Sequence, residues 1–278
     1  MIERLLLLSR HGKRQRLVKH HDTLHESGGL SAEGGPELTV DGLDRILRTG
    51  TALRKRYLEK GACDETCLAI SSGDGKLSPH MIRVESTGLA RTISTATVLI
   101  NGLVPDSTRD ASPTGGIPLP IPVYSRPSSE DYVLRGYADG KCPALVQQVE
   151  DWQRSQEFLE KESASATLRT AVGSYLYANA LAGFAGISLV NGAVPLRESW
   201  NAYDALATST SMMTNASLSA DAEALAAWTE SRKFGLSGGG RICGGALLAK
   251  IVSYLMSDSG PGIMYYSAHY PVMLWCAS

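Results

Sequence analysis

Short apolar runs and amphipathic helical stretches alternate along the first hundred residues. The run Leu5–Ser9 predicts a buried strand, and the chain then turns abruptly polar at Arg10-His11-Gly12. Apolar residues at helical spacing predict a helix over about 41–60, with Asp41 as its N-cap. A second strand is expected over Met81–Val84 and a second helix over about 92–100.

Helical patterns dominate the second half of the chain. A stretch over 106–122 that is rich in Pro, Gly and Ser marks the clearest boundary. The elements expected after it are strands over 121–124 and 264–267 and helices over 144–159, 166–182, 221–231 and 242–256. This layout predicts an α/β sheet with an inserted, mainly helical subdomain. We expect residues 1–105 and 241–278 to form the core and residues 106–240 the insertion.

The composition is that of an ordinary globular protein, with 43% hydrophobic and 20% charged residues. The 27 basic and 28 acidic residues nearly balance, so no basic excess points to nucleic acid. The leading apolar run, Leu5–Leu8, is far shorter than the ~20 residues of a membrane span. It is also too short for a signal peptide. We expect no nucleic-acid partner, no membrane span and, if Met1 is the true start, a cytoplasmic location.

Neither the cysteines nor the histidines follow a metal-binding pattern. The chain has five cysteines, an odd number that does not suggest a disulfide scaffold. Cys63 and Cys67 lack a second pair at zinc spacing, which leaves a local disulfide or ordinary thiols. His20, His21 and His25 lie in a polar segment without helical character. We therefore expect no metal and no cofactor.

Five basic residues follow predicted strand ends or begin a predicted helix. Arg10, His11 and Arg14 follow the first strand, Arg91 precedes the second helix, and His269 follows the last strand. Considered in isolation, Arg91 is better interpreted as a surface arginine and His269 as a structural histidine. Together they would meet where parallel strands open onto a ligand crevice. Histidine can act as a nucleophile and guanidinium groups fork onto phosphate oxygens, so the set suits one dianion.

Several motifs in order resemble the histidine acid phosphatases, branch two of the histidine phosphatase superfamily. The family's Arg-His-Gly-x-Arg motif matches Arg10–Arg14, and its Leu-Thr-x-x-Gly segment matches Leu38–Gly42. Its Leu-Arg-x-Arg-Tyr helix end matches Leu53–Tyr57. Ser86–Thr92 resembles the Ser-Thr-Asp-x-x-Arg-Thr motif, and Tyr266–His269 resembles Tyr-Ser-Ala-His. The likeness runs over nearly the whole chain.

The resemblance implies a fold and an activity. The core would be a three-layer α/β/α sandwich like that of phosphoglycerate mutase. His11 would be the nucleophile and form a phosphohistidine, Arg10, Arg14 and Arg91 would bind the phosphoryl oxygens, and His269 would complete the pocket. The implied reaction is metal-independent hydrolysis of small phosphomonoesters, in a secretory or lysosomal compartment.

Tyr270 is the main departure from the family pattern. It stands where the family has an aspartate that protonates the leaving alcohol. A phenol with an ordinary pKa near ~10 is a reluctant donor, and loss of a general acid costs ~10²–10⁴-fold. Three alternatives stay open: a weakened enzyme with Tyr270 as donor, another donor such as Glu85, or an inactive relative that binds phosphate or a phosphorylated ligand. A phosphomutase would use the same phosphohistidine, although no feature favours it.

Family members also continue beyond the position where this sequence ends. A core without that part would expose a sheet edge and apolar surface. A homodimer is one arrangement that would cover them.

Overall fold

The computed structural model describes most of the chain as two compact units. The described residues are 2–15, 37–59, 61–69, 77–109, 117–138, 140–184, 186–208, 216–235 and 238–277. The histidines at 20, 21 and 25 lie outside these ranges. The first unit comprises Met1–Arg14, Glu37–Gly136 and Gly245–Met273. The second comprises Gln15–Pro36, Tyr137–Gly244 and Leu274–Ser278.

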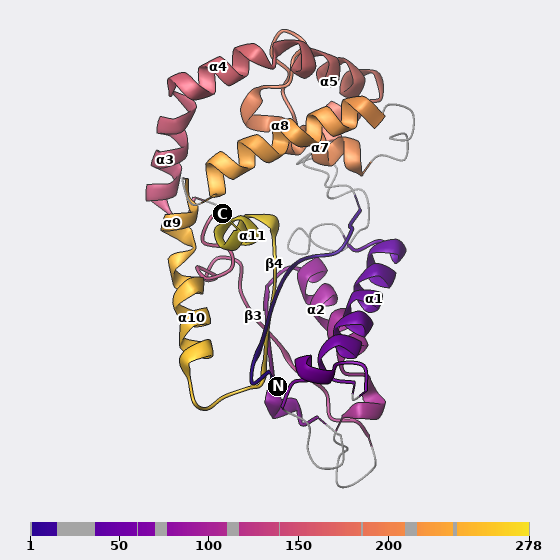
Figure 1. Ribbon diagram of the computed structural model, residues 1–278. Coiled ribbons are helices and arrows are strands. Elements are labelled where there is room, and N and C mark those ends of the chain that lie inside the picture. The colour runs from indigo at the N-terminus through magenta and orange to yellow at the C-terminus, as the bar shows by residue number, and fades with distance from the viewer. Residues whose placement is uncertain are drawn as a thin grey trace. The chain divides into compact units, whose positions relative to one another are not determined.

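A parallel sheet of four strands forms the centre of the first unit (Figure 1). The strands are β1 (Leu5–Arg10), β2 (Ile82–Thr87), β3 (Val123–Arg126) and β4 (Ile263–Ala268). They lie in the order β1-β4-β2-β3, and each pairs in parallel with its neighbours. Because the strands are parallel, their carboxyl ends share one edge of the sheet. The predicted α/β class is confirmed.

The strand β3 belongs to this sheet although it falls within the segment 106–240 that we predicted as an insertion. Its backbone pairs with β2, with Val123 opposite Val84. The second unit includes the continuous segment Tyr137–Gly244.

Helices cover both faces of the sheet, which gives the three layers implied by the family resemblance (Figure 1). One face carries α1 (Val40–Tyr57) and α2 (Ala90–Leu103), and the other carries α10 (Gly245–Met256). The buried residues Val84, Leu99, Leu103, Ile263 and Tyr265 belong to the apolar core of this unit. On the α10 side, the hydroxyl of Tyr254 donates to the carbonyls of Leu5 and Gly262, at 3.2 and 2.9 Å.

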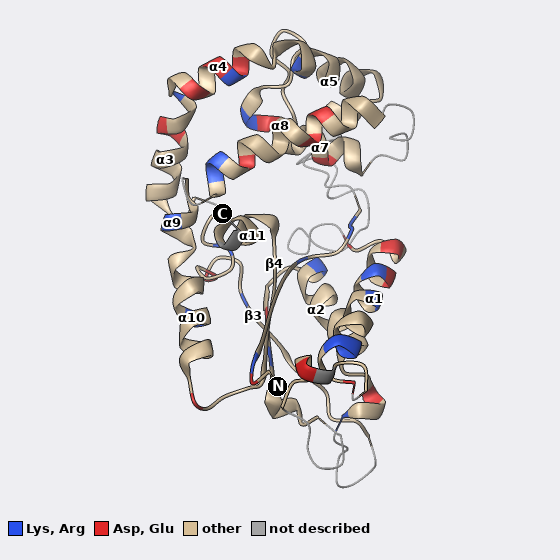
Figure 2. Cartoon of the chain, viewed as in Figure 1, with Lys and Arg blue, Asp and Glu red and all other residues tan. Residues whose placement is uncertain are grey.

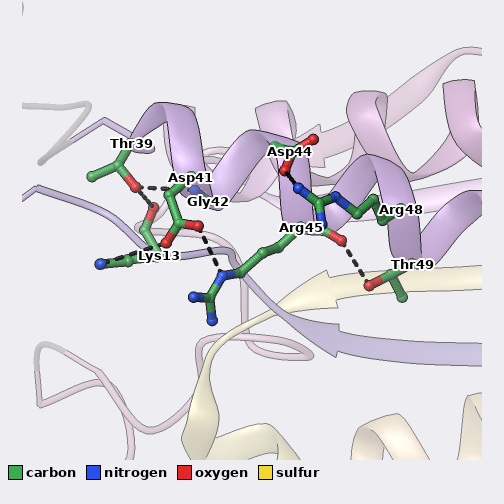
Figure 3. A network of polar contacts seen from close by, with 8 residues as sticks. All are labelled: Lys13, Thr39, Asp41, Gly42, Asp44, Arg45, Arg48 and Thr49. Carbon is green, nitrogen blue, oxygen red and sulfur yellow. Dashed lines mark hydrogen bonds and ion pairs between the residues drawn. The ribbon is translucent and has the colours of Figure 1, made fainter.

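Thr39, rather than the predicted Asp41, caps the N-terminus of α1 (Figure 3). Its hydroxyl oxygen accepts the Gly42 N–H at 3.0 Å, and its own N–H donates to the Lys13 carbonyl at 2.9 Å. Asp41 instead pairs with Arg45 and Lys13, at 3.0 and 3.5 Å, because it already lies inside the first turn. These contacts attach the segment that follows His11 to the start of α1.

Two glycines allow α1 and α2 to pack in close contact. A Cβ atom on Gly50 would lie 2.2 Å from the Leu99 carbonyl oxygen, and one on Gly102 would lie 2.4 Å from that of Leu47. We expect Gly50→Ala to lower the free energy of unfolding by ~1–3 kcal/mol, because the backbone must move to admit the methyl group. Urea denaturation measures the change. Gly245→Ala is the control, since nothing lies within 4 Å of its added Cβ. Equal stability of the two variants would contradict the close packing.

The helix α11 (Tyr270–Ala277) follows β4 almost directly. The sequence pattern did not predict it. Apart from Tyr270, none of its eight residues has a strongly polar side chain, so an amphipathic period is not visible.

The second unit is helical. Its helices are α3 (Pro143–Gln153), α4 (Gln156–Ala164), α5 (Ala166–Ala178), α6 (Leu181–Phe184), α7 (Ser199–Ala207), α8 (Ala216–Phe234) and α9 (Gly240–Cys243). The single helix expected over 144–159 is divided between α3 and α4, because Ser155 caps a new helix by accepting the Phe158 N–H at 3.3 Å. Leu176, Val194 and Leu206 belong to its buried core. Charged residues of both signs are interspersed along α4 (Figure 2).

Of the two alternatives for Cys63 and Cys67, the structure has the local disulfide. Cys142 and Cys243 are thiols, and burial raises the pKa of Cys243 to about 12. None of the helices in the described ranges combines the length and apolar character that a membrane span needs.

Candidate active site

The two candidate histidines lie together at the carboxyl edge of the sheet. His11 follows β1 and His269 follows β4, and these strands are neighbours. The His11 N–H donates to the Ala268 carbonyl at 3.1 Å, and the ring centroids are 5.4 Å apart. Both residues are buried, with 8% of His11 and 5% of His269 exposed. Parallel pairing therefore brings together two residues that are far apart in sequence.

A backbone contact determines which nitrogen of His11 is free for chemistry. The Nδ1 atom lies 2.9 Å from the Gly12 carbonyl oxygen. A carbonyl oxygen only accepts hydrogen bonds, so Nδ1 carries the proton in the neutral ring. The lone pair then resides on Nε2, the atom on which a histidine nucleophile would form its bond.

The surroundings of His11 favour its neutral form. Burial lowers its pKa to about 3, and the positive charges of Arg10, Arg91 and Arg14 contribute to the fall. The hydrogen bond to Gly12 acts in the opposite direction. The three predicted arginines therefore all exert their charge at His11, as a pocket for one dianion requires.

Thr95 connects the turn after β1 to the first turns of α2. The Gly12 N–H donates to the Thr95 hydroxyl at 3.1 Å, and that hydroxyl donates to the Arg91 carbonyl at 2.7 Å. A Cβ atom on Gly12 would lie 2.3 Å from Cδ1 of Ile46, so a side chain at this position would disturb the turn. The contacts keep His11 in a defined position relative to the start of α2.

The N-terminus of α2 supplies further positive potential. Leu89 is its N-cap and offers no side-chain acceptor to the first N–H groups. Arg91 lies in the first turn and adds a full positive charge. Uncapped N–H groups and the helix dipole both favour an anion at such an end.

His269 experiences the same field and a further arginine. Burial lowers its pKa to about 2, with contributions from Arg91, His11, Arg135 and Arg10. Arg135 was not a candidate from the sequence, because it belongs to no recognised motif and only the folded chain brings it near His269. Thr87, which is fully buried, places its Oγ1 atom 3.1 Å from His269 Nε2. Thr87 lies inside the Ser86–Thr92 motif, so closer attention to that motif could have identified it.

The two candidate proton donors lie in different environments. Tyr270 is the first residue of α11, and its ring centroid lies 5.8 Å from the guanidinium carbon of Arg10. Glu85 has both carboxylate oxygens engaged, one with Arg83 and one with Lys250, each at 3.3 Å. Tyr270 therefore contacts a residue of the histidine and arginine cluster, whereas the carboxylate of Glu85 is engaged by two cations outside that cluster.

Two neutral histidines beside several arginines can bind a dianion and offer it a nucleophile. Positive groups that are already in place stabilise developing negative charge without reorganisation. Across the ranges that the structure describes, no three His, Cys, Asp or Glu side chains form a group that could hold a metal ion.

The sequence is similar to curated acid phosphatases, although no family model matches it. It is 30% identical to testicular acid phosphatase of Mus musculus over 203 residues, which are 72% of this chain and 41% of that protein. It is 29% identical to lysosomal acid phosphatase of Xenopus laevis over 153 residues, which are 55% of this chain and 32% of that protein. The chain thus spans less than half the length of these relatives.

Solved structures of phosphatases share the fold. The phytase of Citrobacter braakii superposes with a TM-score of 0.62 at 14% identity, over 99% of this chain and 74% of that one. The multiple inositol polyphosphate phosphatase of Bifidobacterium longum does so with a TM-score of 0.54 at 13% identity, over 98% of this chain and 74% of that one. At these identities the likeness concerns the fold alone.

Proposed function

Since this chain is a relative of the histidine acid phosphatases, we propose that it hydrolyses small phosphomonoesters through a phosphohistidine on His11. The similarity to two acid phosphatases supports the reaction class. The observation that carries the proposal is the bare Nε2 atom of a buried, neutral His11 surrounded by the charges of Arg10, Arg14 and Arg91.

In the proposed reaction, the Nε2 lone pair attacks phosphorus while the bond to the alcohol oxygen breaks. Arg10, Arg14, Arg91 and the N-terminus of α2 offset the charge on the phosphoryl oxygens, and His269 completes the pocket. Phosphoryl transfer depends mainly on such positioning and charge compensation. The alcohol oxygen takes up a proton as it leaves. Water then cleaves the phosphorus–nitrogen bond, which frees His11 and inorganic phosphate.

A second candidate function is phosphate binding without turnover. Tyr270 stands at the position of the family's proton donor, and the carboxylate of Glu85 is engaged by Arg83 and Lys250. A leaving alkoxide without a proton donor raises the barrier, whereas anion binding needs only the arginines.

Hydrolysis of p-nitrophenyl phosphate from pH 4 to 8 in the presence of EDTA tests the proposal. Its leaving group is a good one and needs little protonation. Turnover, with an acid-labile phosphoryl group trapped on His11 by rapid quenching, would support the enzyme. Orthovanadate binding without turnover would support the second candidate. The absence of both turnover and orthovanadate binding would contradict both candidate functions.

Tyr270→Asp tests the proton donor. We expect this variant to raise kcat on an alkyl phosphate such as β-glycerophosphate by ~10²-fold, because a carboxylic acid protonates the alkoxide more readily than a phenol. On p-nitrophenyl phosphate the change should be small. Tyr270→Phe is the matched control, since it keeps a ring beside Arg10 without the hydroxyl. Equal effects of Tyr270→Asp on both substrates would argue against a missing proton donor.

The lysosomal relatives support a secretory or lysosomal location for the protein. Small phosphomonoesters are the proposed substrates.

A further inference from the structure

A chain of buried hydroxyl groups links His269 to the backbone at the start of α2. Thr87 and Thr92 are both fully buried. The Oγ1 atom of Thr87 lies 3.1 Å from His269 Nε2 and 2.7 Å from the Oγ1 atom of Thr92. Each hydroxyl has one proton to donate, so the proton positions along this chain can be worked out.

The backbone determines the direction of the first hydrogen bond. The Thr92 hydroxyl lies 2.8 Å from the Leu89 carbonyl oxygen and 3.1 Å from that of Thr87. Carbonyl oxygens cannot donate, so Thr92 gives its proton to them. Between the two hydroxyls, Thr92 must then accept and Thr87 must donate. With its proton used, Thr87 can only accept from His269.

We propose that Thr87 is a positioning residue that holds His269 with its proton on Nε2, so that Nδ1 is the only nitrogen of this ring able to interact with a bound phosphoryl group. The tautomer follows from the hydrogen-bond chain alone. The role of Nδ1 toward phosphate rests on the proposed function.

The groups around His269 make this arrangement responsive to an anion. Arg10 and His11 act on it from the end of β1, Arg91 from α2, and Arg135 from the turn after β3, while Tyr270 follows it in the chain. Burial and these charges oppose protonation of His269 when no anion is bound. A bound dianion offsets them, and because Nε2 already carries a proton, the second proton must enter at Nδ1. From there it donates a hydrogen bond to a phosphoryl oxygen.

Nuclear magnetic resonance of the ¹⁵N-histidine-labelled protein tests the tautomer without any requirement for turnover. Long-range ¹H–¹⁵N correlations distinguish a protonated ring nitrogen from a bare one, and the His269→Gln variant identifies the His269 signals among the six histidines. At pH 7 without phosphate we expect a protonated Nε2 and a bare Nδ1. A proton on Nδ1 of the wild-type protein would overturn the proposal, whether or not the protein is a phosphatase.

Two variants of Thr87 separate positioning from packing. Thr87→Val keeps the shape but removes the acceptor, and we expect His269 to populate both tautomers. Thr87→Ser keeps the acceptor and should reproduce the wild-type signals. With p-nitrophenyl phosphate, we expect kcat/KM to fall by about 10- to 100-fold in Thr87→Val, the size of effect found when partners that orient metal-binding histidines are removed, and to recover in Thr87→Ser. An unchanged tautomer in a folded Thr87→Val protein would refute the positioning role.

Addition of inorganic phosphate tests the role of Nδ1. We expect the His269 signals of the wild-type protein to move toward the doubly protonated ring as phosphate binds. Phosphate binding that leaves Nδ1 bare would confine the proposal to the tautomer and overturn the contact with phosphate. If phosphate does not bind but the free protein has its proton on Nε2, the proposed function fails while the positioning role of Thr87 stands.

Discussion

His11→Ala should abolish hydrolysis of p-nitrophenyl phosphate, with a fall in kcat of at least ~10⁴-fold. Removal of a nucleophile from a hydrolase costs on this order or more, because no other group offers a covalent route. The bare Nε2 atom of His11 is the only part of the side chain that the proposed reaction uses directly. The measurement is single-turnover and steady-state release of p-nitrophenol at a fixed pH.

His80→Ala provides the matched control, because His80 is an exposed histidine of the same unit. It should leave kcat and KM unchanged. Circular dichroism and orthovanadate binding would show that the His11→Ala protein is folded and that its arginines still bind an anion. A folded His11→Ala protein with more than a tenth of the wild-type activity would exclude His11 as the nucleophile.

Activity should persist well below the pH at which an ordinary histidine becomes protonated. The nucleophile must be neutral, and burial among arginines lowers the pKa of His11 to about 3. A histidine with an ordinary pKa of ~6.5 would be only ~1% neutral at pH 4.5, whereas His11 stays mostly neutral there. The expected advantage at pH 4.5 is therefore about 100-fold, and the acid limb should lie near pH 3 to 4.

The pH dependence of kcat/KM from pH 3 to 8, corrected for ionisation of p-nitrophenyl phosphate, measures this effect. The direction follows from the sign of the shift: a lowered pKa extends the neutral form toward acid. Arg10→Gln removes a positive charge that lowers the pKa of His11, so its acid limb should move upward in pH. A wild-type acid limb near pH 6.5 would contradict the low pKa of His11.

The sequence pattern predicts the regular elements of the first unit well. All four strands lie within a few residues of their expected positions, because continuous apolar runs such as Leu5–Leu8 are typical of strands buried on both faces. The prediction of the residue at which α1 begins was less accurate. Asp41 is a good N-cap residue by type, but the contact of Thr39 with the Lys13 backbone decides where the helix begins, and this contact depends on the folded chain.

The residues of the candidate site were likewise only partly predictable from the sequence. Arg10, His11, Arg14, Arg91 and His269 were identifiable because functional side chains gather where strands end and helices begin, and because their motifs resemble those of a known family. Arg135 was not identifiable, because it belongs to no recognised motif. Thr87 lies within the Ser86–Thr92 motif, but its contact with His269 appears only in the folded chain. Their importance comes from proximity to His269 across the sheet edge.

The sequence by itself determined the α/β class, the positions of the strands and the identity of the basic residues at their carboxyl ends. Local pattern suffices for these features, because periodicity and residue type act over a few neighbouring positions. Only the tertiary structure decided that His11 is neutral with a bare Nε2 atom, which partners hold His269, and that β3 joins the sheet. Burial, hydrogen-bond direction and the combined charge of several arginines arise from residues far apart in the chain, which are neighbours only after folding.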